Sequence, residues 1–202
     1  MTKTNTEMMK KIRDDILDLK ESPLYEYRVK NHYFPVLGEG NHNADIVFIG
    51  EAPGEKEALT GRPFCGPAGR ILDELLEGIG LDRQDVYISN VVKDRPPNNR
   101  DPLPAEIELY SPFLYRQLEV LKPKVIAALG RFSTKYILEK FGLPEATQTI
   151  TQLHGKVIDV KVPWGKAKII PLYHPAVALY SGGSKKVLVE DFKVIAKFGK
   201  KG

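Results

Sequence analysis

Apolar and polar positions alternate along the chain in blocks that predict strands followed by helices. Short apolar runs predict buried strands at residues 45–50, 86–89 and 124–129, and a strand pair at residues 156–160 and 168–172. Apolar residues at helical spacing predict helices at residues 6–20, 67–76, 104–121, 131–141 and 184–198. Because strand and helix alternate, the sequence predicts a three-layer α/β/α sandwich of the α/β class, with a short and mainly parallel central sheet.

The length and the uninterrupted pattern favour one domain over 1–202. A chain of 202 residues suits one core, and neither a repeat nor a low-complexity linker divides it. We expect residues 1–22 to form an N-terminal helix and connector, and residues 185–202 to form a basic C-terminal helix and tail. A Gly/Pro-rich loop of about 17 residues precedes the helix that begins at Pro67, and loops of this length are usually functional or disordered.

Composition places the chain among ordinary globular proteins. Hydrophobic residues make up 42% and charged residues 28% of the chain, and the formal net charge of +4 permits a polyanionic partner. The single cysteine, Cys65, excludes an internal disulfide and a four-thiolate cluster and fits a reducing compartment, so we expect a cytoplasmic protein. No apolar run approaches the ~20 residues of a membrane helix, and residues 1–11 are too polar for a signal peptide.

Polar residues follow three of the predicted strands at the point where each strand ends. Glu51-Ala52-Pro53-Gly54 follows the first strand, Asn90 follows the second, and His174-Pro175-Ala176 follows the last. Ligands of open α/β sheets bind outside the carboxyl ends of the strands, so we expect these groups to converge on one crevice. Each also has a structural interpretation: Glu51 as a solvated turn residue, Asn90 as an Asx-turn, and His174 as a donor to a backbone carbonyl.

Spacing argues against several other chemistries. The loop after residue 50 lacks the Gly-Lys-Ser/Thr ending of a P-loop, and no G-x-G-x-x-G follows a strand. A G-x-S-x-G nucleophile elbow is absent, and the four histidines lack the close spacing of a zinc site. The sequence therefore does not support an NTPase, a dinucleotide enzyme, a serine hydrolase of that type or a zinc enzyme.

Five blocks of residues follow one another in order between about residues 20 and 197. The blocks are Gly50-Glu51-Ala52-Pro53-Gly54, Thr60-Gly61-Arg62-Pro63-Phe64-Cys65-Gly66-Pro67-Ala68-Gly69, Val86-Tyr87-Ile88-Ser89-Asn90-Val91-Val92-Lys93, Arg95-Pro96-Pro97 with Asn99-Arg100, and Tyr173-His174-Pro175-Ala176. Together they resemble the ordered motifs of the family 4 uracil-DNA glycosylases. The resemblance implies an enzyme that extrudes a uracil nucleotide from the DNA stack and removes the base.

The resemblance implies a uracil pocket made from these blocks. Phe64 is expected to stack on the base, and Asn90 to donate to uracil O4 and accept from N3–H. Glu57 matches an acidic position that helps to close the pocket near C5, with an ordinary surface acid as the alternative. Ala52 and Gly54 complete the predicted pocket, where backbone N–H groups can approach the base closely.

The same resemblance implies three catalytic residues, Glu51, Asn90 and His174. Breaking the N-glycosidic bond leaves negative charge on the uracil oxygens, so hydrogen-bond donors aimed at them are useful. His174 is the expected donor to O2, and Glu51 is expected to orient or deprotonate water. Ala52 stands where the related family 1 enzymes carry a catalytic aspartate, so a less direct role for Glu51 stays open.

Phosphate contacts are expected from two segments that flank the predicted pocket, the Pro-rich loop after Asn90 and the loop after the His174 motif. Basic side chains and backbone N–H groups bind phosphates, and Leu179 or Tyr180 is suited to wedge into the gap left by the base. For the basic residues a solvated face is the alternative. The predicted DNA-binding residues are Lys93, Arg95, Arg100, Tyr180, Ser181, Gly182 and Ser184.

The chain departs from the family at the [4Fe–4S] cluster that family 4 members usually hold on four cysteines. Alignment on the neighbouring motifs puts Leu19, Ser22, Asp94 and Tyr110 at the four cysteine positions. Cluster ligation needs thiolates, so we expect no cluster, metal or other cofactor. Tyr110 and Asp94 are predicted to fill the space as a buried hydrogen-bonded pair, with Asp94 as a solvated loop acid as the alternative. Cys65 is predicted to pack beside Phe64.

The sequence therefore predicts a monomeric, monofunctional uracil-DNA glycosylase that needs no cofactor, has no membrane association and acts on uracil-containing DNA. Two alternatives stay open. One is a uracil or nucleic-acid binder that has lost turnover. The other is a glycosylase with a shifted preference for deaminated bases, because Ala58 replaces an aspartate that is common in the family. A uracil-crosslinking relative is disfavoured, since its extra basic loop is not visible in the sequence.

Overall fold

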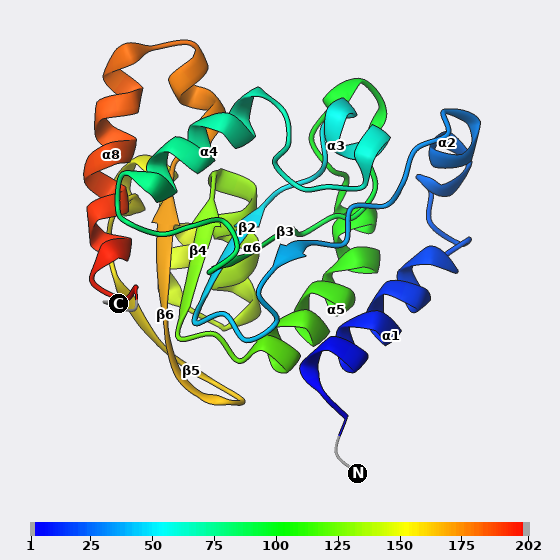
Figure 1. The fold of residues 1–202 in the computed structure, drawn as a ribbon, viewed down its shortest axis with the longest axis horizontal. Coiled ribbons are helices and arrows are strands. Elements are labelled where there is room, and N and C mark those ends of the chain that lie inside the picture. Colours follow the sequence, from blue (N-terminus) through cyan, green and yellow to red (C-terminus); the bar gives the residue numbers. More distant parts are fainter. Residues whose placement is uncertain (1–2, 200–202) are drawn as a thin grey trace.

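The computed structural model describes residues 3–199 and arranges them around one six-stranded sheet (Figure 1). Its strands are β1 (Glu39–Gly40), β2 (Ile46–Gly50), β3 (Tyr87–Asn90), β4 (Val125–Leu129), β5 (Ile158–Val162) and β6 (Gly165–Leu172). They pair in the order β1-β3-β2-β4-β6-β5. The four central strands are parallel, and the edge strands β1 and β5 are antiparallel to their neighbours. The carboxyl ends of the central strands therefore lie along one edge of the sheet.

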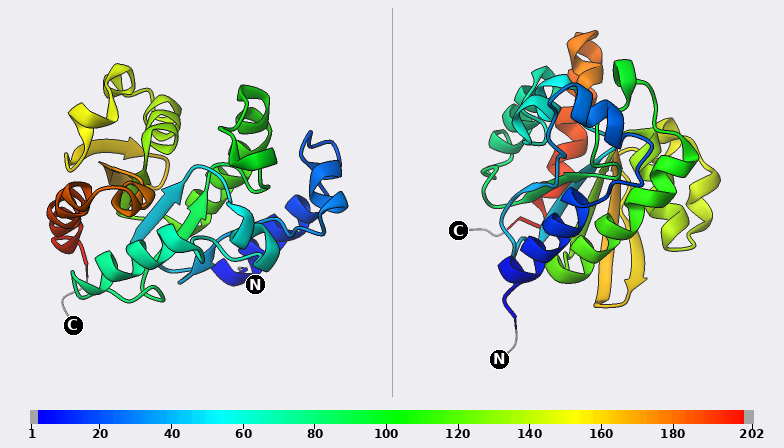
Figure 2. Two further views of the ribbon diagram at one scale, coloured as in Figure 1. Left: turned by 90° about the horizontal axis from the view of Figure 1, so that it is seen from above. Right: turned by 90° about the vertical axis from the view of Figure 1, so that its right-hand side faces the viewer.

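Helices cover both faces of this sheet (Figure 2). They are α1 (Asn5–Leu17), α2 (Tyr25–Lys30), α3 (Glu55–Thr60), α4 (Pro67–Glu77), α5 (Pro104–Leu121), α6 (Arg131–Lys140), α7 (Ile150–Leu153) and α8 (Gly182–Ala196), with 3-10 turns at Pro97–Asn99, Pro144–Thr147 and Pro175–Leu179. Helices α5, α6 and α7 pack on one face, and α1 packs against α5. Helices α4 and α8 pack on the other face.

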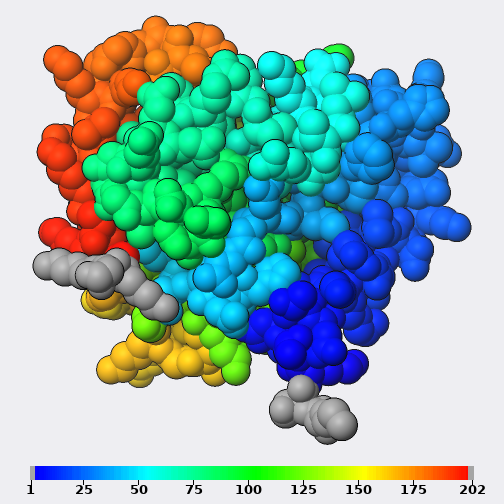
Figure 3. Space-filling view, in the orientation of Figure 1, coloured from blue at the N-terminus to red at the C-terminus, as the bar shows by residue number. Residues whose placement is uncertain are grey.

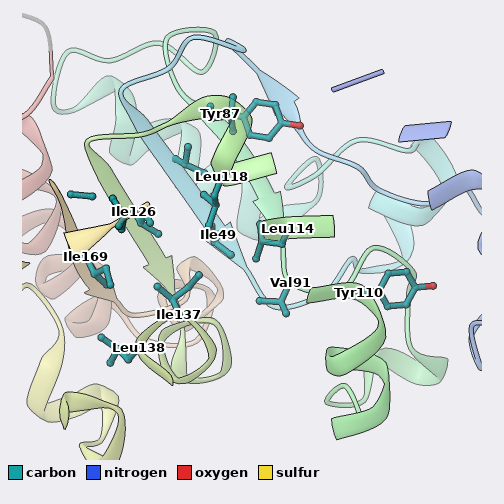
Figure 4. Close-up of a cluster of buried hydrophobic side chains, with 14 of the residues drawn as sticks. Ile49, Tyr87, Val91, Tyr110, Leu114, Leu118, Ile126, Ile137, Leu138 and Ile169 are labelled. Carbon is teal, nitrogen blue, oxygen red and sulfur yellow. The ribbon is translucent and has the colours of Figure 1, made fainter. Parts of the chain in front are cut away.

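The side chains of β2 explain why the sheet needs two helical layers. Val47 and Ile49 join the apolar cluster on one face, and Ile46 and Phe48 join the cluster on the other. Side chains alternate across a strand, so a strand that is apolar at every position must be covered on both sides. In the first cluster, Ile49 and side chains of β4 and β6 face residues of α5 and α6 (Figure 4). The predicted α/β/α sandwich is confirmed.

The loop after β2 differs from the sequence prediction. Within the predicted Gly/Pro-rich loop lies α3, which is capped at its C-terminal end by Gly61 with a φ of +71°. Only Ala58 of this helix is buried, so no apolar stripe marks it in the sequence. Smaller differences are that α1 ends at Leu17 instead of near residue 20, and that the strand pair extends further toward its turn. In the structure β5 continues to Val162 and β6 begins at Gly165.

Helices α3 and α4 lie between the two ends of the described chain. In Figure 3 the N-terminal segment in blue and the C-terminal helix in red lie at opposite edges of the face, separated by the cyan and green residues of α3 and α4. The turn between α3 and α4 carries Phe64. Within residues 3–199 no helix has both the length and the apolar character to cross a bilayer.

Candidate active site

A cavity of about 460 Å³ opens where the parallel strands β2, β3 and β6 end. Its lining includes every predicted catalytic and uracil-binding residue, namely Glu51, Ala52, Gly54, Glu57, Phe64, Asn90 and His174. The other lining residues are Pro53, Ala68, Pro96, Asn99, Arg100, Asp101, Ala176 and Tyr180. A wider hollow of about 590 Å³ beside β1 contains none of the predicted residues. Segments about 120 residues apart in the sequence thus meet at the carboxyl edge of the sheet.

Phe64 lies in a tightly packed turn between α3 and α4. Its φ of +48° is a left-handed value that is uncommon for a residue with a side chain. A Cβ atom on Gly69 would lie 1.7 Å from the carbonyl oxygen of Phe64, so glycine is required there. From another direction, Arg83 donates hydrogen bonds to the carbonyls of Pro63 and Phe64. The backbone of the turn is therefore held on two sides while the aromatic ring lines the cavity.

Gly50 makes room for two of the site residues. It ends β2 in register with Asn90 at the end of β3. A Cβ atom on Gly50 would lie 2.3 Å from Oδ1 of Asn90 and 2.7 Å from Cε2 of Phe64. The absence of a side chain at this position therefore allows the amide and the ring to lie together at the floor of the cavity.

Asn90 presents an amide that the rest of the described chain does not use. The residue is 2% exposed, and Lys93 donates to its backbone carbonyl. Within residues 3–199 no hydrogen bond involves its side-chain amide, which lines the cavity. The amide faces the cavity, where it can pair with a ligand that offers one donor and one acceptor. The Asx-turn interpretation does not apply to this side chain.

His174 is fixed as a neutral hydrogen-bond donor. It caps the 3-10 turn Pro175–Leu179, and its Nδ1 accepts a hydrogen bond from the backbone N–H of Ala176 at 3.2 Å. Burial lowers the pKa of His174 to about 4, with the charge of Glu57 acting in the opposite direction. In the neutral ring the proton therefore lies on Nε2, which is left to donate into the cavity. The ring centroid lies 5.5 Å from that of Phe64.

Glu51 follows β2 directly and borders the same cavity. Burial, together with the nearby charge of Asp101, raises the pKa of Glu51 to about 7, and Arg131 acts in the opposite direction. A carboxyl group that ionises near neutral pH is suited to accept a proton from water. Asp101 was not identified from the sequence as a site residue. Its only signal in the sequence is its position next to the motif residue Arg100.

Glu57 is part of the cavity wall, which argues against its interpretation as an ordinary surface acid. Helix α3 directs its Oε1 to the backbone N–H groups of Cys65 and Gly66, at 3.0 and 2.8 Å. A Cβ atom on Gly54 would lie 2.7 Å from its Oε2, so the second oxygen faces the loop after β2. Glu57 therefore joins that loop to the start of α4. Cys65 is half-buried, as is suitable for a packing role.

The prediction that Lys93 contacts DNA phosphates is wrong. The side chain is 0% exposed, and its ammonium group donates to three oxygens inside the protein, those of Ser89, Asn90 and Gln117. The ammonium group is therefore not accessible to a phosphate at the surface. The sequence did not reveal this, because a lysine beside other basic residues looks the same whether it points inward or outward.

Arg95 and Arg100 are also engaged within the protein. Arg95 is 8% exposed at its side chain, and it donates to Asn99 at 2.8 Å and to the hydroxyl of Tyr33. Arg100 makes two hydrogen bonds to the buried carboxylate of Glu106, at 2.6 and 2.9 Å, and lines the cavity. Arg100 therefore belongs to the cavity wall, and Arg95 holds the lining residue Asn99. The burial of Arg95 argues against the predicted phosphate contact, and the contact of Arg100 with DNA stays a prediction.

The second predicted DNA segment is exposed beside the cavity. Tyr180 lies on the cavity rim and is 87% exposed, and Leu179 is 45% exposed. Ser181 occupies the N-cap position of α8 without a capping hydrogen bond from its side chain, and Gly182 is exposed beside it. Ser184 follows in the first turn of that helix. Their contacts with DNA stay predictions.

Three of the four residues at the cysteine positions form one buried network. The hydroxyl of Tyr110 lies 2.6 Å from Oδ2 of Asp94 and 2.7 Å from Oγ of Ser22. Arg28, which the sequence did not single out, makes an ion pair with Asp94 at 3.1 Å. The predicted Tyr110–Asp94 pair is confirmed, and Asp94 is not a solvated acid. Leu19, at the fourth position, packs against the apolar cluster.

These four positions do not fit the family's iron–sulfur cluster. None supplies a thiolate, and the side chains of the network satisfy one another in the space between α2, the loop after β3 and α5. In the part of the chain that the structure describes, no group of three or more His, Cys, Asp or Glu side chains is arranged to hold a metal ion.

The cavity at the strand ends of this α/β/α sandwich offers an aromatic face and a hydrogen-bonding amide, which fits the class of base-flipping DNA glycosylases. A family model described as "Uracil DNA glycosylase superfamily" matches residues 37–193. The chain belongs to this superfamily and, within it, to the type-4 group, which confirms the resemblance of the motifs.

Several curated relatives carry the name "Type-4 uracil-DNA glycosylase". The protein from Archaeoglobus fulgidus is 50% identical to this chain over 87% of this chain and 86% of its own length. The protein from Sulfurisphaera tokodaii is 46% identical, over 93% of this chain and 83% of its own length. The protein from Thermotoga maritima is 39% identical over 98% of both chains.

Proposed function

We propose that this protein is a uracil-DNA glycosylase that hydrolyses the N-glycosidic bond of an extruded uracil nucleotide and leaves an abasic site. The observation that carries the proposal is the convergence of Phe64, Asn90 and His174 with Glu51 on one cavity. The names of the relatives support the same activity. Simple binding does not require a neutral imidazole and a near-neutral carboxyl group on the same cavity.

Base recognition follows from the amide and the ring. The ring of Phe64 supplies a stacking face, and the amide of Asn90 donates to uracil O4 and accepts from N3–H. Cytosine presents a donor and an acceptor in the opposite order, so it leaves the amide unpaired in a fixed orientation. Glu57 closes the wall near C5, where the methyl group of thymine would clash.

Bond cleavage transfers the electron pair of the N-glycosidic bond to uracil. The uracil anion then carries negative charge at O2, where the Nε2–H of His174 donates a hydrogen bond. Because its pKa is about 4, the imidazole is neutral at pH 7, and its single N–H lies on Nε2 while Nδ1 accepts from Ala176. A donor of this kind contributes about 10²–10³-fold to the rate.

Water completes the reaction at the sugar. The ionised carboxylate of Glu51 accepts a proton from the water whose oxygen forms the new bond to C1′, and the uracil anion later takes up a proton from solvent. A pKa of about 7 leaves a large fraction of Glu51 ionised at neutral pH, while keeping it basic enough to accept that proton.

We also propose that the protein is a monomer and that it acts on DNA in the cytoplasm. Phosphate contacts come from the exposed segment Tyr180–Ser184, with Tyr180 or Leu179 as the wedge that replaces the flipped base. The lone cysteine fits a reducing compartment. Gel filtration with and without a short DNA duplex tests the oligomeric state.

One experiment tests the activity. The full-length protein is treated with EDTA and incubated with a labelled oligonucleotide that contains one uracil, and abasic sites are then cleaved in hot alkali. Matched oligonucleotides contain thymine or hypoxanthine instead. We expect cleavage only with uracil, loss of cleavage in Asn90→Ala, and a fall of about 10²–10³-fold in His174→Ala.

Other outcomes of this experiment favour the alternatives. Tight binding of the uracil oligonucleotide without an abasic product favours a binder that has lost turnover. Cleavage of the hypoxanthine oligonucleotide favours a shifted preference for deaminated bases, for which Ala58 was the sequence indication; in the structure Ala58 is buried within α3 rather than part of the cavity lining.

A further inference from the structure

Lys93 places an ammonium group directly behind the residue that faces the base. Its Nζ lies 2.7 Å from the backbone carbonyl oxygen of Asn90, 2.7 Å from Oγ of Ser89 and 2.7 Å from Oε1 of Gln117. The side chain is fully buried. The mechanism above does not use this group.

The surroundings of Lys93 match an ammonium ion rather than a neutral amine. The amide nitrogen of Gln117 donates to the carbonyl of Leu37 at 2.7 Å, which turns its oxygen toward Lys93. The hydroxyl of Ser89 donates to the same carbonyl at 3.0 Å, which leaves its lone pairs for Lys93. Three acceptors pair with the three protons of an ammonium group, whereas a neutral amine has only two. Burial alone lowers the pKa of Lys93 to about 7, and these three hydrogen bonds favour the charged form.

Within residues 3–199 no carboxylate forms an ion pair with Lys93. The adjacent Asp94 is engaged by Arg28 and Tyr110. The charge of Lys93 is therefore not cancelled by a close neighbour, and it lies inside the protein, where solvent screens it less than at the surface. The position of the charge is also fixed, because the ammonium group donates to the backbone carbonyl of Asn90, the last residue of β3.

We propose, on the basis of the function proposed above, that Lys93 is a positioning residue that fixes Asn90 against the base and holds a positive charge behind it that stabilises the departing uracil anion. At a separation on the order of 8 Å and an effective dielectric constant of about 20, one unit charge changes the rate by about 30-fold, or about 2 kcal/mol.

The leaving group distinguishes this electrostatic role from a structural one. Fluorine at C5 withdraws electrons and makes the leaving anion more stable. We measure single-turnover excision of uracil and of 5-fluorouracil from oligonucleotides of the same sequence. The quantity compared is the rate for 5-fluorouracil divided by the rate for uracil. In Lys93→Met we expect uracil excision to fall by about 30-fold and 5-fluorouracil excision to fall several-fold less, so that the ratio rises.

Two further variants separate the effect of the charge of Lys93 from the effect of its hydrogen bonds. Ser89→Ala removes one acceptor of Lys93 but keeps the charge, so the ratio should equal that of the wild-type protein. Gln117→Glu adds a negative charge beside the ammonium group, so the ratio should rise as in Lys93→Met. Cooperative thermal unfolding identifies the variants that fold, and Gln117→Glu decides the question if Lys93→Met does not fold.

An unchanged ratio in the folded variants that alter the charge would overturn the electrostatic role, even if excision is slower. An equal rise in Ser89→Ala would overturn it as well, because that variant keeps the charge. If the wild-type protein does not excise uracil at all, the proposed function itself fails. The two failures are therefore distinguishable in one set of measurements.

Discussion

At the scale of the residue, one physical effect gives His174 and Glu51 their different states. Removal from water disfavours the charged form of either group. It lowers the pKa of the His174 imidazole to about 4 and raises the pKa of the Glu51 carboxyl to about 7. At neutral pH the cavity therefore holds both a neutral hydrogen-bond donor and a carboxyl group that is partly ionised.

The rate of excision should rise with pH as Glu51 loses its proton, with a midpoint near pH 7. His174 is neutral throughout the range from about pH 5.5 to 8 and adds no step there. Asp101→Asn removes a negative charge that opposes ionisation of Glu51, so the midpoint should move to lower pH. Single-turnover rates across this range provide the measurement.

Glu51→Gln serves as the control for this profile, because the rise should disappear when no carboxyl group can ionise. A decline at higher pH that persists in Glu51→Gln belongs to another group, of which Lys93 is the candidate. A midpoint that stays in place or moves upward in Asp101→Asn would contradict the assignment of the rise to Glu51.

At the scale of the element, the buried network of Ser22, Arg28, Asp94 and Tyr110 joins parts of the chain that no strand connects. It links α2 and the segment before it to the loop after β3 and to α5. Arg28 and Asp94 are both buried, so each needs the other as a partner. The network occupies the positions to which the motif resemblance assigns the cluster cysteines, and it is held by hydrogen bonds and one ion pair.

Tyr110→Phe should lower the free energy of unfolding by about 1–3 kcal/mol, because it removes a buried hydroxyl that hydrogen-bonds to the carboxylate of Asp94 and to Ser22. Urea unfolding of the full chain measures the change. Tyr136→Phe is the matched control, since its hydroxyl lies 3.4 Å from the carbonyl of Ser111 and should contribute less. Equal losses in the two variants would show that the network adds no particular stability.

Helix α3 shows how an element without an apolar stripe can still organise the site. Its one buried residue is Ala58, yet it carries Glu57 to the backbone N–H groups at the start of α4. The periodicity of the sequence did not predict this helix, because periodicity detects burial of a face and α3 buries almost nothing. Glu57 was identified from the sequence, but its hydrogen-bond partners, the backbone N–H groups of Cys65 and Gly66, were not.

At the scale of the whole molecule, the sheet gathers the site from separate parts of the sequence. The parallel strands β2, β3 and β6 end at one edge, and each end carries one of the groups that line the cavity. The residues at the family's four cluster positions supply no thiolate, so folding and activity should not depend on a bound cluster.

Removal of metal should therefore change nothing. We expect the purified protein to lack visible absorbance, and its thermal unfolding temperature and uracil excision rate to be the same before and after prolonged dialysis against EDTA. A brown protein, or a fall in the unfolding temperature after dialysis, would contradict the assignment of the four cysteine positions to a metal-free network.

The sequence by itself determined the alternation of strands and helices, the polar residues at the strand ends and the lack of cysteines at the four cluster positions. These are local properties, because side-chain periodicity and residue type do not depend on distant neighbours. From them the sandwich and the convergence of Glu51, Asn90 and His174 could be predicted, whereas Phe64 was predicted only from the resemblance to the family.

Only the tertiary structure decided which charges face inward and what surrounds them. It turned Lys93 toward Asn90 instead of toward solvent, brought Arg28 to Asp94 across 66 residues, and set Asp101 near Glu51. The charge state of each group depends on burial and on neighbours that are remote in the sequence. Those neighbours exist only once the chain has folded, so the chemistry of the cavity is a property of the packed molecule.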